Sequence, residues 1–153
     1  MRRGATLVFA AFAAIIATLP AHAAPSVEDQ FKQFDLFGQW AADCDQPATP
    51  ANPHVGISMP SEGLVLEEHD LGTEFARNRY SVQAATRISM TRLSVDVIFQ
   101  PGAQSEERQK LVFLIRKGTR RTMFNQPDGG EVRVKDGVSL AHRTKTPVLK
   151  KCD

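Results

Sequence analysis

The chain lacks an excess of charge of either sign once its first 23 residues are set aside. The full sequence of 153 residues has a formal net charge of +2. Arg2 and Arg3 supply that excess, because the first 23 residues contain no acidic side chain. Residues 24–153 carry 17 basic and 17 acidic side chains. A balanced chain has no broad electrostatic attraction to nucleic acid or to an anionic membrane, so we expect neither as a partner.

Sequence signatures of catalysis are also missing. No serine lies in a G-x-S-x-G nucleophile elbow. No glycine-rich phosphate loop of the usual form is present either. We therefore predict no catalytic residue and no cofactor, and we expect a protein that is not an enzyme.

The first 23 residues have the three parts of a secretory signal peptide. A positively charged start is followed by an apolar run over residues 5–19, and Ala21-His22-Ala23 is an A-x-A cleavage site. The run is shorter than the roughly 18 to 20 residues that a bilayer-spanning helix needs. We therefore expect cleavage after Ala23, one mature domain over residues 24–153 without membrane insertion, and a periplasmic or secreted location.

Cysteine is scarce, since the chain has only Cys44 and Cys152. In an exported protein such a pair is typical of a disulfide, whereas the alternative is two free thiols. The bond would hold the C-terminus against the first strand of the mature domain. It would also leave no cysteine for nucleophilic or thiolate–metal chemistry.

Helical periodicity is confined to the start of the mature chain, where residues 26–36 are predicted to form one short helix. Val27, Phe31 and Phe34 recur on one face of this helix. Beyond it, apolar residues alternate with period two in short segments, and no alternation of strands and helices indicates a parallel sheet. We predict an all-β fold, an antiparallel meander of eight or nine strands that is barrel-like and has a short N-terminal helix. The predicted strands lie at residues 40–44, 55–59, 64–66, 80–84, 93–99, 111–115, 121–124, 132–134 and 138–140.

Gly38-Gln39-Trp40 follows the predicted helix and opens the first strand. A G-x-W tripeptide in this position resembles the start of lipocalins and other calycins. Small secreted bacterial inhibitors of metalloproteases share that barrel plan, with one Trp and one disulfide. The resemblance implies that Trp40 plugs one end of a barrel and that a basic residue near the last strand packs across its ring, with Arg143 as the expected partner.

The chain also departs from lipocalins. It has no long C-terminal helix and no T-D-Y turn before a late strand, and both departures argue against a large cup for a lipophilic ligand. Residues 40–44 and Pro53-His54 are in addition similar to secreted proteobacterial proteins of unknown function.

The loop over residues 45–54 is the strongest candidate for binding. Its three prolines stiffen it, and a stiff loop on a stapled scaffold loses little entropy on docking. The alternative is a tight crossover between the first two strands. The side chains that we predict to contact a partner are Gln46, Pro47, Thr49, Pro50, Asn52 and His54.

The densest group of potential metal ligands lies at residues 67–70. On a strand Glu67 and His69 share one face, so the two would hold an ion if His54 or His142 joined them from a neighbouring strand. The competing interpretation is a solvated strand end. We adopt the second interpretation and predict no metal site.

A local basic knob is expected around one hairpin turn. Arg116-Lys117 and Arg120-Arg121 flank this turn. Such a knob would contact an acidic partner or, alternatively, keep the hairpin soluble and its edge unpaired.

Three hypotheses of function follow. The first is an exported, monomeric, non-catalytic binding protein of the bacterial envelope that engages a protein partner or a small apolar ligand. The second is a calycin-type protease inhibitor whose residues 24–28 reach into a target cleft. The third is a small metal-assisted hydrolase that uses Glu67, His69 and one more histidine. A filled barrel interior would exclude the apolar-ligand version of the first hypothesis.

Overall fold

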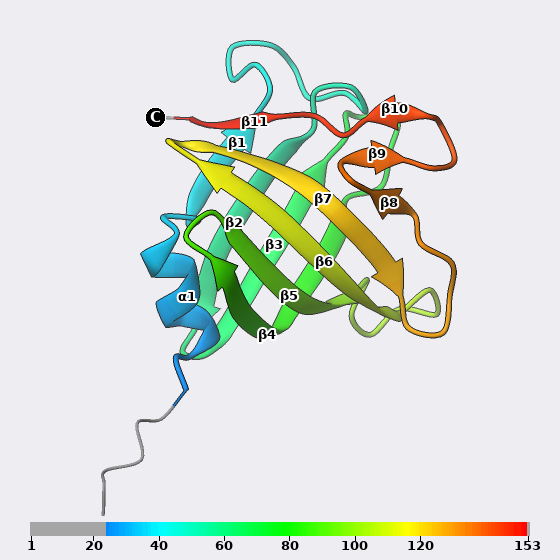
Figure 1. The fold of residues 1–153 in the computed structure, drawn as a ribbon. Helices are drawn as coiled ribbons and strands as arrows, with labels where there is room; N and C mark the ends of the chain where they lie inside the picture. Colours follow the sequence, from blue (N-terminus) through cyan, green and yellow to red (C-terminus); the bar gives the residue numbers. More distant parts are fainter. Residues whose placement is uncertain (1–23, 153) are drawn as a thin grey trace, which may run out of the picture.

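In the computed structural model, which describes residues 24–152, the chain forms a closed antiparallel β-barrel (Figure 1). The predicted signal peptide, residues 1–23, lies outside the described residues. The barrel strands are β1 (Gly38–Ala41), β2 (His54–Ser61), β3 (Leu64–Asp70), β4 (Asn78–Ser89), β5 (Arg92–Phe99), β6 (Glu107–Arg116), β7 (Thr119–Pro127) and β11 (Leu149–Cys152). Their order is β7-β11-β1-β2-β3-β4-β5-β6, and pairing of β6 with β7 closes the ring. The predicted all-β barrel is therefore confirmed.

Three short strands extend from β7 beside the ring. They are β8 (Val134–Lys135), β9 (Val138–Ser139) and β10 (Thr144–Lys145). β8 joins β7 through the single pair Asn125↔Val134, and β9 and β10 follow in order. β11 pairs with β7 only at Leu149↔Arg120 and Lys150↔Thr119, so the two strands separate beyond these pairs. The side sheet lies along the part of β7 that β11 leaves unpaired.

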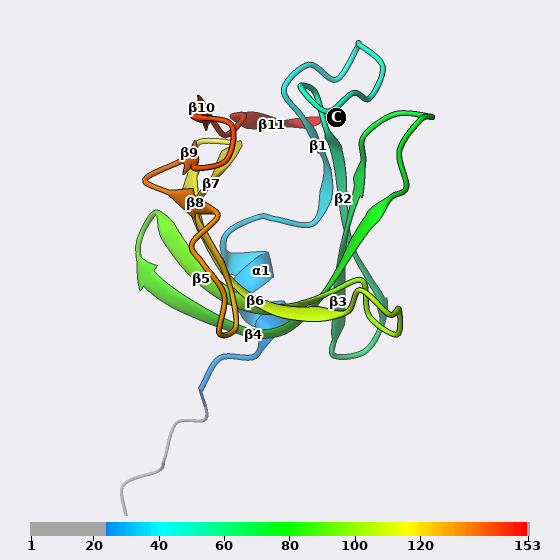
Figure 2. The ribbon, with the colours of Figure 1, turned by 90° about the vertical axis from the view of Figure 1, so that its right-hand side faces the viewer.

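The helix α1 (Val27–Gln33) closes one end of the barrel. Figure 2 looks along the barrel and shows α1 across the far end of the ring of strands. Ser26 and Asp29 form a capping box, in which each side chain accepts a hydrogen bond from the backbone N–H of the other residue. The helix is shorter than predicted, because the chain turns at Asp35, whose φ is 51°. Within residues 24–152 no helix is long and apolar enough to cross a membrane.

Apolar side chains fill the end of the barrel that α1 covers. The indole of Trp40 is 1% exposed, and its Nε1 donates to the Leu36 carbonyl oxygen at 2.8 Å. The largest fully buried side chains are Trp40, Phe31, Leu36, Leu93, Val55, Val65 and Val95. This end is therefore a packed core rather than a hollow.

The basic side chain over the Trp40 ring is that of Lys151, not that of Arg143. The Lys151 Nζ lies 5.7 Å from the ring centroid, and the two residues are paired between β1 and β11. Arg143 is exposed and immediately precedes β10, which pairs with β9 and not with β1. The prediction of Arg143 failed because the sequence analysis did not include β11, the strand that lies against β1.

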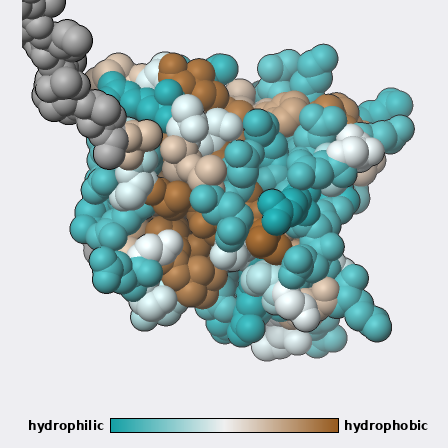
Figure 3. Space-filling model, turned by 90° about the horizontal axis from the view of Figure 1, so that it is seen from below, coloured by the Kyte–Doolittle hydropathy of each residue, from teal (hydrophilic) through white to brown (hydrophobic). Residues whose placement is uncertain are grey.

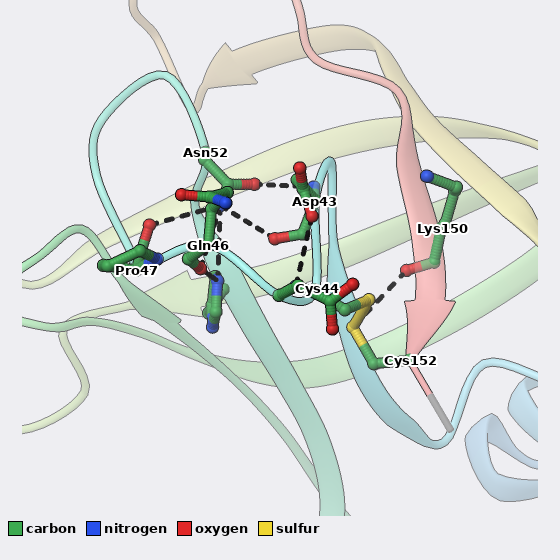
Figure 4. The surroundings of a disulfide bond; sticks show 9 residues. Asp43, Cys44, Gln46, Pro47, Asn52, Lys150 and Cys152 are labelled. Carbon is green, nitrogen blue, oxygen red and sulfur yellow. Dashed lines mark hydrogen bonds between the residues drawn. A yellow bond between two sulfur atoms is a disulfide. The ribbon is translucent and has the colours of Figure 1, made fainter.

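Cys44 and Cys152 form the predicted disulfide, with their Cα atoms 5.8 Å apart (Figure 4). The bond ties the end of β11 to the segment that follows β1. Both cysteines are used, and within residues 24–152 no free cysteine remains. A disulfide is compatible with an oxidising, exported environment.

Apolar groups remain on the surface as well. Figure 3 shows hydrophobic atoms bordered by polar ones on the face seen from below, which is the side of the molecule away from β11. Over the described residues, the large apolar side chains that are exposed are Leu64, Phe75, Ile88, Met90, Leu140 and Val148.

Candidate functional site

An ion pair crosses the interior of the barrel. The Arg120 guanidinium on β7 donates to both oxygens of Glu67 on β3, at 3.0 Å to Oε2 and 2.8 Å to Oε1. β3 and β7 are four strands apart in either direction around the ring, so the two side chains extend from opposite walls. Only 2% of the Arg120 side chain and 6% of the Glu67 side chain are exposed. The guanidinium also lies over the Phe113 ring, 4.3 Å from its centroid.

His69 and Tyr80 extend this buried group. The His69 Nε2 is hydrogen-bonded to the Glu67 Oε1 at 2.6 Å, and the His69 ring lies 4.9 Å from the Tyr80 ring. Burial alone would raise the pKa of the Glu67 carboxyl, but Arg120 and His69 together hold that pKa at about 2. Burial also raises the pKa of Tyr80 above its ordinary value. At neutral pH the carboxylate is therefore ionised and the phenol is neutral.

A second set of polar side chains lines β6 and β7. Asn125 donates through Nδ2 to the Gln109 Oε1 at 2.7 Å, and the Gln109 Nε2 donates to Glu107 at 2.5 Å. Glu107 in turn accepts two hydrogen bonds from Arg133, and Arg133 lowers the pKa of that carboxyl. The Asn125 Oδ1 is buried without a hydrogen-bond partner among the residues described. Polar groups therefore occupy part of the interior that an apolar-ligand barrel would leave empty.

A cavity of about 180 Å³ lies where β7 and β11 separate, and we call it the seam pocket. Its polar side chains include His69 and Arg120, so the buried ion-pair group forms part of its wall. Most of the remaining wall is proline, valine and leucine. The residues that line the pocket are Pro50, Pro53, Val55, His69, Leu71, Arg120, Arg121, Thr122, Thr146, Pro147 and Leu149.

Internal hydrogen bonds hold the proline-rich loop that borders this pocket (Figure 4). The Asn52 Nδ2 donates to the carbonyl oxygens of Asp43 at 2.9 Å and Pro47 at 3.2 Å, while its Oδ1 accepts from the Asp43 N–H at 2.9 Å. The His54 Nε2 is hydrogen-bonded to the Gln46 carbonyl oxygen at 2.9 Å. Asn52 and His54, both predicted to contact a partner, use these polar atoms to fix the loop.

The β3–β4 connection packs closely against the same loop. Gly72 has a φ of 99°, and a Cβ at this position would lie 2.8 Å from the Ala48 carbonyl oxygen. Only glycine fits such an approach without displacing backbone. Leu71 is thereby held beside the proline-rich loop, where both line the seam pocket.

The predicted binding residues are divided by the structure. Pro50 lines the seam pocket, where it meets His69 from the predicted metal pair. Pro47 lines a separate open cleft on the other side of the loop, together with Phe75. Gln46 and Thr49 are exposed on the loop, outside the seam pocket.

The predicted metal pair is not joined by a third ligand. Glu67 and His69 do share a face, as expected, but both Glu67 oxygens accept hydrogen bonds from Arg120. His54 is paired with Asp70 on β3 and so lies on the opposite face from His69, and His142 is in the exposed turn after β9. Across residues 24–152 no three His, Cys, Asp or Glu side chains are placed to hold a metal ion.

Arg120 belongs to the site but was not predicted as part of it. It was expected in one basic knob with Arg116, Lys117 and Arg121, whereas its side chain is buried in the barrel. Successive side chains of a strand point to opposite faces. This alternation would have distinguished Arg120, which shares a face with Thr122, from Arg121 on the other face. An arginine at an inward position is a signal for a buried carboxylate partner.

The seam pocket offers shape, charge and hydrogen bonds, while no serine or cysteine lines it. Both oxygens of Glu67, which is hydrogen-bonded to the pocket residues His69 and Arg120, accept from the Arg120 guanidinium. No family model, no curated protein and no solved structure matches the chain. The resemblance to calycins therefore stays a prediction beyond the barrel itself.

Proposed function

We propose that this chain is an exported, non-catalytic binding protein that takes one side chain of a protein partner into the seam pocket. The observation that carries the proposal is the pocket: a cavity of about 180 Å³ with mostly apolar walls and a charged, hydrogen-bonded group at His69 and Arg120. Such a combination is typical of ligand sites, where a few polar groups orient a largely apolar contact. The disulfide supports the exported setting.

The dimensions favour a protein partner over a small apolar ligand. Pockets for drug-sized molecules span roughly 300–1,000 Å³, and the seam pocket is smaller than that range. The interior next to it is crossed by the Arg120–Glu67 ion pair and packed with core side chains. A single side chain presented by a protein fits this space, whereas a lipophile would have to displace a buried ion pair.

Rigidity of the pocket walls also favours docking. Asn52 holds the proline-rich loop, and the disulfide holds β11. Preformed walls lose little conformational entropy when a partner binds. Loops that a rigid scaffold positions often carry binding in this way.

A displayed library of random peptides, panned against residues 24–153, tests the proposal. Leu71→Trp narrows the pocket, and Leu64→Trp is its matched control, since Leu64 begins β3 and lies outside the seam pocket. We expect the selected peptides to share one anchor residue and to bind the Leu71→Trp protein at least about tenfold more weakly, a loss of roughly 1.4 kcal/mol. The Leu64→Trp protein is expected to bind them like the unsubstituted protein.

The proposal fails if the selected peptides bind the Leu71→Trp protein unchanged or if no peptide is enriched. Thermal unfolding of both variants serves as the folding control, with Tm values expected to agree within a few degrees.

A calycin-type protease inhibitor is the second candidate, favoured by one observation. Ala24 and Pro25 are exposed and precede the capped start of α1, so they are free to enter a target cleft. Ser26 caps the helix and Val27 packs against the core, so a deletion must end at Pro25 to spare the fold. Removal of Ala24 and Pro25 is expected to abolish inhibition of a secreted metalloprotease at an unchanged Tm. Undiminished inhibition by the shortened chain would exclude this candidate.

A further inference from the structure

Basic residues are concentrated on one wall of the barrel, although residues 24–153 carry equal numbers of basic and acidic side chains. Residues 24–107, which form α1 and β1–β5, carry 13 acidic and 5 basic side chains. Residues 108–152, which form nearly all of β6 and all of β7–β11, carry 12 basic and 3 acidic side chains. Because β6, β7 and β11 are neighbours around the ring, the basic residues share one continuous wall (Figures 1 and 2).

Only part of this basic wall is neutralised by neighbouring carboxylates. Lys110, Arg120, Arg133 and Lys151 each form an ion pair. Seven other basic side chains of β6–β11 and their turns are exposed and form no ion pair within residues 24–152. Arg108 is set aside, because it lies near the start of β6, at the opposite end of that strand from Arg116. We call the other six the basic stripe: Arg116, Lys117, Lys135, Arg143, Lys145 and Lys150.

The strand register places members of the basic stripe side by side. Arg116 and Lys150 are both paired with Thr119, one on each side, and therefore share a face. Lys135 and Lys145 are likewise paired with Val138. Strands lie about 4.8 Å apart, so each couple of cations is separated by about 10 Å of backbone. The stripe is therefore a regular array and not a scatter of single charges.

The basic stripe runs along the edge of the seam pocket. Lys145 directly precedes Thr146, and Lys150 directly follows Leu149, and both Thr146 and Leu149 line the pocket. A partner protein bound over the pocket would therefore contact the cations of β10 and β11.

We infer that the partner is an acidic protein, whose carboxylates face the basic stripe while its anchor side chain occupies the seam pocket. The inference rests on the proposed function for the position of the partner. The acidic character of the partner is tested separately from that position. Complementary charge of this kind steers association and raises the rate of encounter.

Other polyanions fit the surface less well. Residues 128–152 contain no Phe, Tyr or Trp, so this part of the chain has no aromatic platform on which nucleic-acid bases stack. A mostly apolar pocket also suits a protein side chain better than a phosphate group.

The test compares two charge reversals of equal size. Lys145→Glu with Lys150→Glu alters the basic stripe, and Arg87→Glu with Arg92→Glu is the matched control on the exposed β4–β5 hairpin. Poly-L-glutamate and the peptides selected by panning are the probes, measured by surface plasmon resonance over a series of salt concentrations. We expect the stripe variant to lose about tenfold in association rate at low salt and to show a weaker salt dependence, with the control within about twofold.

The outcomes separate this inference from the proposed function. If Leu71→Trp weakens peptide binding but the stripe variant does not, the acidic partner is wrong and the pocket stands. If the stripe variant binds poly-L-glutamate more weakly while no peptide binds the Leu71→Trp protein more weakly, the preference for an acidic partner is supported. The seam pocket is then wrong as the binding site. Tighter binding of duplex DNA or of phosphatidylglycerol vesicles than of poly-L-glutamate at equal salt would overturn the inference of an acidic protein.

Discussion

At the residue scale, Arg120 holds a place in the interior that an apolar side chain usually fills. Its guanidinium reaches Glu67 on the opposite wall and covers the Phe113 ring. Taking both charges out of water is costly, so the pair adds little net stability while each partner depends strongly on the other. The pair instead places a polar group beside the seam pocket. In the proposed function, this group determines which partner side chain the pocket can orient.

The interdependence of the pair is measurable as a double-mutant cycle. Glu67→Leu leaves a buried guanidinium without a counter-charge and is expected to cost about 3–5 kcal/mol in free energy of unfolding. The double variant Glu67→Leu with Arg120→Met is expected to recover most of that loss, because two apolar side chains need no counter-charge. Urea denaturation of the single and double variants gives these values. A single-variant cost below about 1 kcal/mol would contradict the buried pair.

The low pKa of Glu67 makes stability dependent on pH in acid. The carboxyl titrates near 4.5 in the unfolded chain and at about 2 in the folded one. Its contribution is therefore fully present above about pH 4.5 and declines as the pH falls from there towards 2. That contribution is on the order of 3 kcal/mol. Urea denaturation at pH 7 and pH 3 is expected to show a smaller acid loss for Glu67→Gln than for the unsubstituted protein, and equal losses would contradict this role.

At the element scale, the proline-rich loop and β11 together make the seam pocket. The loop is held by Asn52 and by the close approach of Gly72, and β11 is held by its pairing with β1. The loop contains no helix or extended strand, and β11 is only four residues long. The pocket therefore depends on a few contacts that link segments distant in sequence.

Removal of the Asn52 side chain should loosen the loop. Asn52→Ala leaves the Asp43 N–H without the carboxamide oxygen that it donates to. We expect a loss of about 0.5–1.5 kcal/mol in stability, because the exposed Asp43 N–H can bond to water instead. Gln46→Ala is the control, because this exposed side chain forms no hydrogen bond in the described structure. Hydrogen exchange at the Asp43 amide is the readout, and an exchange rate equal in both variants would show that Asn52 does not hold the loop.

Local patterns in the sequence predicted the elements whose form is set locally. The cap at Ser26, the alternation along β5 and the scarcity of cysteine correctly indicated the helix start, the barrel and the disulfide. β11 escaped prediction because residues 149–152 contain one inward apolar residue, Leu149, among charged neighbours. Its strand form comes from pairing with β1 and β7, which only the closed barrel supplies. Arg120 was misplaced for the same reason, since its partner Glu67 is 53 residues away.

At the scale of the whole molecule, one covalent bond and one charge pattern act over the full barrel. The disulfide joins Cys44 and Cys152, which are 108 residues apart, so it closes β2–β11 into one loop and leaves α1 and β1 outside it. Basic residues are concentrated on β6–β11, whereas the acidic residues of 24–107 lie mostly in α1 and in the connections between strands. The seam pocket lies where the basic wall of β7 and β11 meets the loop after β1.

Loss of the disulfide is expected to weaken the fold and the pocket together. A loop of this length gives a stabilisation of roughly 4.7 kcal/mol in the chain-entropy model. The Cys44→Ala, Cys152→Ala double variant should therefore lose several kcal/mol in stability and bind the selected peptides less tightly. Urea denaturation and peptide titration check both effects. Two titratable thiols in the unfolded, unreduced protein would contradict the bond itself.

The most direct test of the seam pocket as the binding site is an amide chemical-shift map of isotope-labelled residues 24–153 with a selected peptide. We predict the largest shifts at Leu71, Thr122 and Thr146, with the amides of α1 unchanged. Largest shifts on α1, or on the apolar face of Figure 3 that lies away from β11, would contradict the account.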